Sequence, residues 1–96
     1  MGVDDLEADA QHVAELLRDE GLAPRTWMAA AGDTFAEHDH GYDKVLVCVG
    51  GSISFTTPSA GERELGPGDR WELPAGTPHS AVVGAGGVTC VEAPRR

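Results

Sequence analysis

The pattern of hydrophobic and polar positions divides the chain into two parts. Over residues 4–20, apolar side chains recur every three or four positions, which predicts an amphipathic α-helix with a single apolar stripe. The apolar positions of this stripe are Leu6, Ala10, Val13 and Leu17, with Leu16 beside them. Gly21 and Pro24 end the predicted helix, because glycine readily takes the left-handed conformation of a helix end and proline cannot continue the helix.

From Arg25 onward the pattern changes to short apolar runs separated by glycine- and proline-rich turns. The runs predicted as strands are 25–30, 34–40, 44–49, 52–57, 63–65, 70–73, 80–83 and 88–93. Many short strands at this spacing predict an antiparallel sandwich or barrel. Gly50-Gly51 between two apolar runs predicts a tight hairpin, because glycine adopts a positive φ without steric cost. The glycine-rich stretch 84–87 predicts a further turn.

Composition and charge narrow the class of protein. A length of 96 residues and an apolar share of 41% are ordinary for one globular domain. The net charge is −9, and the first twenty residues hold seven acids against Arg18 alone. This excess of acids argues against nucleic acid or anionic membrane as a partner, since both need clustered Lys and Arg. With no apolar run of about 18 residues and no secretory leader pattern, we expect a cytoplasmic protein.

Three histidines are the main candidates for chemistry. His38 and His40 are two positions apart, which places both imidazoles on one face of a β-strand. His79 follows the turn-rich stretch 74–78. Should the sheet curl so that these segments meet, three neutral ring nitrogens would converge on one divalent transition metal and leave positions open for an anionic ligand or hydroxide. The alternative is that the histidines only line a polar loop surface.

Two spaced motifs surround these histidines. In the first motif, five residues separate a glycine from a His-x-His pair, three more lead to a further anchor position, and six more lead to a second glycine. These anchors are Gly32, His38, His40, Lys44 and Gly51. In the second motif, five residues separate a glycine from a Pro-x-Gly, two more lead to a histidine, and a final anchor follows four positions later. These anchors are Gly68, Pro74, Gly76, His79 and Val83. With both motifs in order, residues 25–93 resemble the cupin family of small jelly-roll barrels. That family has a glutamate where this chain has Lys44 and an asparagine where it has Val83.

The resemblance implies an all-β cupin double-stranded β-helix, a jelly-roll barrel, at 23–96, preceded by one N-terminal α-helix at 1–22. It further implies that His38, His40 and His79 bind a divalent metal inside the barrel; Zn, Ni, Fe, Mn and Cu all occur in the family. Its activities include oxygenases and isomerases as well as non-enzymatic sensors, so the fold does not define the function. We expect a metal-binding cupin with a small-molecule ligand, and the alternative is a metal-independent binding or sensing module without catalysis. Open sheet edges and the helix stripe favour a homodimer.

Lys44 is the only lysine of the chain, and it occupies the position where the family offers a carboxylate ligand. An ammonium beside a dication is repelled, so Lys44 turns away, loses its proton or weakens the metal site. In an enzyme, Lys44 and Tyr42 would be the candidate catalytic residues, since a deprotonated lysine acts as a base or binds carbonyl groups. The plainer expectation is a salt bridge to Asp43, Glu37 or Glu72. A one-residue shift of the loop would instead make Asp43 an oxygen ligand.

The remaining polar candidates carry less weight. Cys48 and Cys90 show no metal-binding spacing, and we expect two buried apolar thiols, with a disulfide or a cavity-lining thiol as alternatives. Arg25 and Arg70 would suit an anionic substrate, although pairing with neighbouring acids is the expected use. His12 lies off the helix stripe, where we expect it to be solvated.

Overall fold

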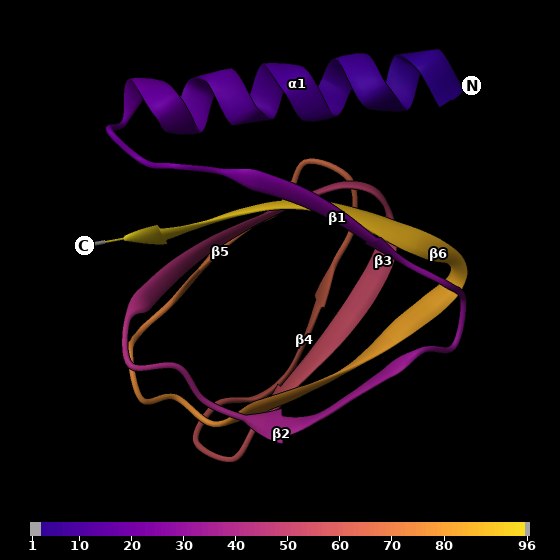
Figure 1. Ribbon diagram of the computed structural model, residues 1–96. Coiled ribbons are helices and arrows are strands. Elements are labelled where there is room, and N and C mark those ends of the chain that lie inside the picture. Colours follow the sequence, from indigo (N-terminus) through magenta and orange to yellow (C-terminus); the bar gives the residue numbers. More distant parts are fainter. Residues whose placement is uncertain (1–2, 96) are drawn as a thin grey trace.

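Antiparallel strands curl around a common interior, and a helix lies along the outside of this barrel (Figure 1). The computed structural model describes residues 3–95. Its elements are α1 (Val3–Asp19), β1 (Arg25–Ala29), β2 (Thr34–His38), β3 (Asp43–Thr57), β4 (Gly61–Leu65), β5 (Arg70–Leu73) and β6 (His79–Arg95). The predicted helix and the all-β barrel are therefore confirmed.

The long strands β3 and β6 pair with each other and form the centre of the sheet. The main strand order is β1-β6-β3-β4, while β2 also pairs with β6 and β5 also pairs with β3. Each of the two central strands thus carries one partner on its first half and another on its second half. β3 pairs with β5 over its first half and with β4 over its second half, and β6 pairs with β2 and then with β1 in the same way.

The hairpin expected at Gly50-Gly51 is wrong, and so is the turn expected at 84–87. The chain continues in the strand at both places, so the predicted runs 44–49 and 52–57 are the two halves of β3. The β3–β6 register shifts on both sides of Gly50 and Gly51. Gly51 has a φ of 70°, and a Cβ there would overlap the carbonyl oxygen of Gly87. The glycines therefore form a bulge that bends the paired strands around the barrel instead of reversing them.

The alternation of side chains along β3 produces two separate apolar cores. Residues facing the interior form the barrel core, whose buried members are Leu46, Cys48, Ile53, Phe55, Leu65, Ala81, Val83, Val88 and Cys90. Residues facing outward pack under α1 in a second core, whose buried members are Ala10, Ala14, Leu17, Val45, Val47, Val49, Val91 and Ala93. Because both faces of the first half of β3 are covered, that half is buried almost continuously.

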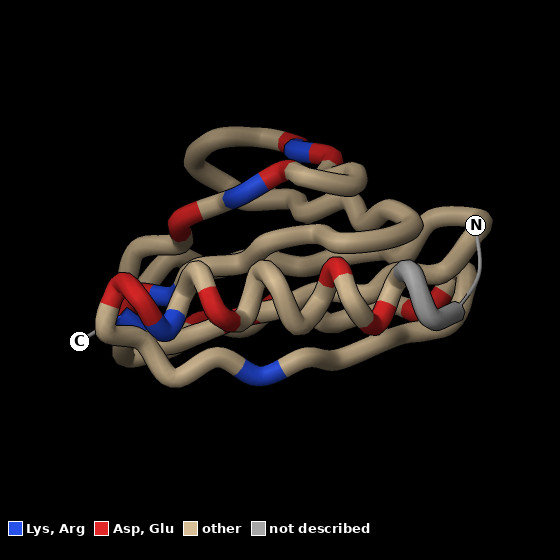
Figure 2. Tube along the Cα trace, turned by 90° about the horizontal axis from the view of Figure 1, so that it is seen from above, with Lys and Arg blue, Asp and Glu red and all other residues tan. Residues whose placement is uncertain are grey.

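The helix lies against β3, β6 and β1, with its acidic residues distributed along its length (Figure 2). Leu17 is buried in the helix–sheet core as expected, whereas Leu16 is 49% exposed and lies outside the stripe. At the C-terminal end of the helix, Glu20 accepts two hydrogen bonds from Arg70, at 2.7 and 2.8 Å, and one from Arg95 at 3.3 Å. Arg70 thus pairs with acids at the surface, the use expected for it.

The two cysteines are neighbours on adjacent strands, and both belong to the barrel core. Cys48 and Cys90 are register partners on β3 and β6, both are fully buried, and both are free thiols. The expectation of buried apolar thiols is confirmed. The hydrogen bond that the Cys90 thiol makes with Cys48, together with burial, raises the pKa of Cys90. Within residues 3–95, no helix has the length and hydropathy that a bilayer crossing requires.

Candidate metal centre

Three histidines from separate segments meet at one side of the barrel interior. His38 is the last residue of β2, His79 is the first residue of β6, and the two are register partners. His40 lies in the loop after β2, because the strand expected over 34–40 ends at His38. One ring nitrogen of each histidine lies within 4.8 Å of the others. The ring centroids are 4.4 Å apart for His38 and His79 and 4.9 Å apart for His38 and His40.

Two hydrogen bonds hold the loop that carries His40 against the loop that precedes His79. The backbone N–H of Gly76 donates to the carbonyl oxygen of His40 at 2.8 Å. The backbone N–H of Ala75 donates to Asp43 Oδ1 at 2.7 Å. Gly76 has a φ of 75°, a conformation that favours glycine and explains the Pro-x-Gly of the second motif. Asp43 anchors this loop and does not belong to the histidine cluster.

Hydrogen bonds to backbone carbonyls determine which ring nitrogen is free in two of the histidines. His38 Nδ1 lies 2.7 Å from the carbonyl oxygen of Ala36, and His79 Nδ1 lies 2.9 Å from that of Thr77. A carbonyl oxygen only accepts, so each Nδ1 carries the proton and donates it. In the neutral form of each ring the lone pair is therefore on Nε2, the arrangement typical of metal-ligating histidines.

The surroundings lower the pKa of two of the three imidazole rings. Burial lowers the pKa of His79, which is 2% exposed, and the nearby His38 and Lys44 lower it further. Burial also lowers the pKa of His40, with the Lys44 ammonium as the next cause. Only the neutral imidazole binds a metal, so these shifts extend the metal-competent form to lower pH.

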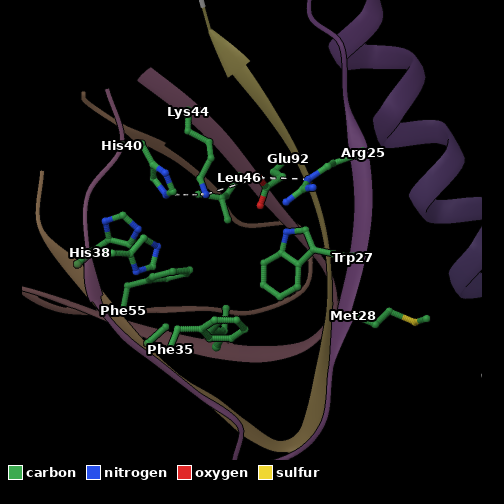
Figure 3. A pocket seen from close by; sticks show the side chains of 13 residues that line it. Arg25, Trp27, Met28, Phe35, His38, His40, Lys44, Leu46, Phe55 and Glu92 are labelled. Carbon is green, nitrogen blue, oxygen red and sulfur yellow. Dashed lines mark hydrogen bonds and ion pairs between the residues drawn. The ribbon is translucent and has the colours of Figure 1, made fainter. Parts of the chain in front are cut away.

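Lys44 lies inside the barrel between the histidines and a carboxylate. Its Nζ is 3.4 Å from His40 Nε2 and 3.6 Å from Glu92 Oε2 (Figure 3). The expected salt bridge to Asp43, Glu37 or Glu72 is wrong. Glu72 pairs in register with Val45, which faces the helix side of the sheet, and side-chain alternation points Lys44 the other way.

Glu92 is the residue of this site that the sequence analysis missed. It is buried on β6 and pairs in register with Leu46 of β3 and Arg25 of β1. The signal was available in the alternation itself, because Cys90, two positions before Glu92, faces the barrel interior. What the sequence lacked was the identity of the strand beside β3, without which Glu92 and Lys44 cannot be brought together.

A cavity of about 350 Å³ adjoins the histidines. Its walls include the histidine cluster, the charged residues described above and apolar side chains, in full Arg25, Trp27, Met28, Phe35, His38, His40, Lys44, Leu46, Ile53, Phe55, His79, Ala81 and Glu92. Trp27 Nε1 is buried and has no hydrogen-bond partner among residues 3–95. Tyr42 contacts His40, with ring centroids 5.3 Å apart, but it is 42% exposed and does not line the cavity.

Comparison with known proteins places this barrel in one class. No protein-family model matches the sequence, and no curated protein is similar to it in sequence. Solved structures do match. The DMSP lyase DddQ from Ruegeria pomeroyi DSS-3 has a TM-score of 0.72 and 25% identity over 78% of this chain. A cupin superfamily protein from Desulfitobacterium hafniense DCB-2 has a TM-score of 0.67 and 19% identity over 76% of this chain. A variant of oxalate decarboxylase from Bacillus subtilis has a TM-score of 0.68 and 25% identity over 76% of this chain.

The shared architecture is a cupin β-barrel. Together with the two histidine motifs, it identifies the chain as a small cupin. The match spans 38% of DddQ, 65% of the Desulfitobacterium protein and 20% of oxalate decarboxylase. The activities of these larger proteins therefore do not transfer to this chain with the fold.

Proposed function

We propose that this small cupin binds a divalent transition metal through His38, His40 and His79 and a small molecule in the adjoining cavity. The observation that carries the proposal is the convergence of three ring nitrogens within 4.8 Å. For two of the rings the hydrogen bonds of Nδ1 leave Nε2 free for the ion. The rings of His38 and His79 are thus already oriented for a metal, whereas His40 Nε2 is in contact with Lys44.

Three neutral nitrogen donors suit zinc, nickel, iron, manganese and copper, and geometry alone does not select among these metals. When bound, such an ion supplies a Lewis-acid centre with open coordination positions. The three histidines would hold it where β2 ends and β6 begins. The rigidity of the site comes from the backbone bonds of His38 and His79 and from the tie between His40 and Gly76.

The alternative is a metal-independent binding or sensing module, and one contact favours it. The Lys44 ammonium lies 3.4 Å from His40 Nε2, so it uses the lone pair that a metal would need. Binding of an ion would require Lys44 to leave His40, and Glu92, 3.6 Å from Nζ, offers the nearest counter-charge. A metal-binding site with this competitor is weaker than one with a carboxylate at position 44.

The experiment is a zinc titration of untagged, chelator-treated protein by calorimetry, with elemental analysis of the loaded sample. We expect about one zinc per chain, and loss of this binding in the His38→Ala/His79→Ala double variant. His12→Ala is the matched control, because His12 is exposed on α1, away from the cluster, and should leave the titration unchanged. Equal and negligible zinc in the wild type and the double variant would overturn the metal site.

Four finer expectations stay predictions. One is catalysis by Lys44 and Tyr42, which can be measured once a substrate is known. Two others are a cytoplasmic location and a boundary after residue 22 between the helix and the barrel. A homodimer is favoured by the open edge of β1 and by Met28, which is 75% exposed. Light scattering coupled to size-exclusion chromatography would give the molar mass in solution, and a mass equal to that of one chain would exclude the dimer.

A further inference from the structure

We propose that the Lys44–Arg25 end of the cavity is a carboxylate-binding subsite, so that the ligand of this cupin is a small carboxylate with an apolar body. The inference rests on the proposed function, because it places the ligand beside the three histidines. It is carried by the local charge, by the hydrogen-bond donors and by the shape of the cavity.

The charge at this end of the cavity is opposite to that of the chain. Arg25 and Lys44 each lie 3.6 Å from Glu92, and the three groups together carry a charge of +1. The whole chain carries −9. Lys44 is 10% exposed, so its ammonium acts in surroundings where water screens it weakly. An anion that enters the cavity therefore meets a net attraction from these three groups.

The same end of the cavity holds more hydrogen-bond donors than acceptors. The Lys44 ammonium carries three N–H groups and has two polar neighbours, His40 and Glu92. Trp27 Nε1–H has no partner within the described part of the chain, and its indole nitrogen is directed towards Glu92 and Arg25 (Figure 3). Unpaired buried donors are unfavourable until an acceptor reaches them. A carboxylate supplies two acceptor oxygens and the matching charge.

The opposite wall of the cavity is apolar and largely aromatic. Phe35 and Trp27 are in edge-to-face contact, with ring centroids 5.9 Å apart, and Phe55 lies beside the histidines. A cavity of about 350 Å³ equals roughly a dozen water volumes, so a ligand of about ten non-hydrogen atoms fits it. A flat apolar ring with one carboxylate matches both ends of the cavity.

The test compares benzoate with benzamide, which has the same shape without the charge. Each is titrated calorimetrically into the metal-free and the zinc-loaded protein. We expect benzoate to bind the zinc-loaded protein at least about tenfold more tightly than benzamide, as one charge-assisted hydrogen bond predicts. Lys44→Met should remove this preference, and Lys44→Arg should retain most of it. Arg18→Gln is the control, since it changes the net charge equally at an exposed helix position.

Circular dichroism of each variant shows that it is folded, and the zinc titration of the wild type tests the proposed function separately. Zinc binding without a preference for benzoate, or with a Kd for benzoate weaker than about 10 mM, overturns the subsite and leaves the metal site standing. A Lys44-dependent preference for benzoate in a protein that does not bind zinc supports the subsite and overturns the metal site. An unchanged preference in Lys44→Met overturns the assignment to Lys44.

Discussion

The ion pair of Lys44 and Glu92 is buried inside the barrel, with each side chain 10% exposed and the charged atoms 3.6 Å apart. At an effective dielectric constant of about 20, two unit charges at this distance attract each other by about 5 kcal/mol. The cost of removing both groups from water offsets much of that attraction. Among the described residues the pair is also asymmetric, because Glu92 has a second cation in Arg25, whereas the other polar neighbour of Lys44 is the imidazole of His40.

This asymmetry predicts unequal effects on the free energy of unfolding of the metal-free protein. Glu92→Gln leaves a buried ammonium without a counter-charge and should cost about 3–5 kcal/mol. Lys44→Met leaves the carboxylate with Arg25, whose side chain is 76% exposed, and should cost about 1–3 kcal/mol. The double variant should be more stable than the sum of the two losses implies, because it removes both charges together.

The assay is urea unfolding followed by circular dichroism in the presence of a chelator. Glu72→Gln is the matched control, since the Arg95–Glu72 pair, with 3.1 Å between the charged atoms, is 35% and 58% exposed and should contribute less than about 1 kcal/mol. A larger loss in Lys44→Met than in Glu92→Gln would refute the reasoning. So would additive losses in the double variant, because they would mean that the two groups do not interact.

Two further predictions concern the bend of β3 and the effect of pH. Gly51→Ala should lower the free energy of unfolding by more than about 3 kcal/mol, because the added Cβ overlaps Gly87 and the φ of 70° is strained for alanine. Gly61→Ala, with a φ of 77° and open space around it, should cost only about 1–2 kcal/mol, and equal losses would contradict the role of the bulge. The lowered pKa values of His40 and His79 mean that the unfolded chain binds protons more readily, so the metal-free protein should lose stability as pH falls below the ordinary 6.5. Urea midpoints between pH 8 and pH 5 test this, and a midpoint that rises on acidification would contradict it.

The histidine cluster was expected because two spaced motifs, His-x-His and the Pro-x-Gly before His79, resemble those of the cupin family. The alternation argument for His38 and His40 assumed a strand over both residues, whereas His40 lies in the loop after β2. The bend at Gly50-Gly51 was not predictable in this way. A positive φ at glycine suits both a hairpin turn and a bulge, and only the long-range pairing of β3 with β6 decides between them.

The same distinction explains why Lys44 was recognised and Glu92 was not. Lys44 stands out because the cupin motif has a glutamate at that position. Glu92 lies in an ordinary strand pattern, and its place in the site is evident only from the pairing of β6 with β3. Its carboxylate is on the far side of Lys44 from His40, so it balances the ammonium rather than the histidine cluster. The negative charge that a glutamate at position 44 would bring to the histidines is thus supplied to Lys44 instead. Any cation held by these three neutral rings would keep its full charge beside a net positive wall, and the group best suited to neutralise both is an anionic ligand in the cavity.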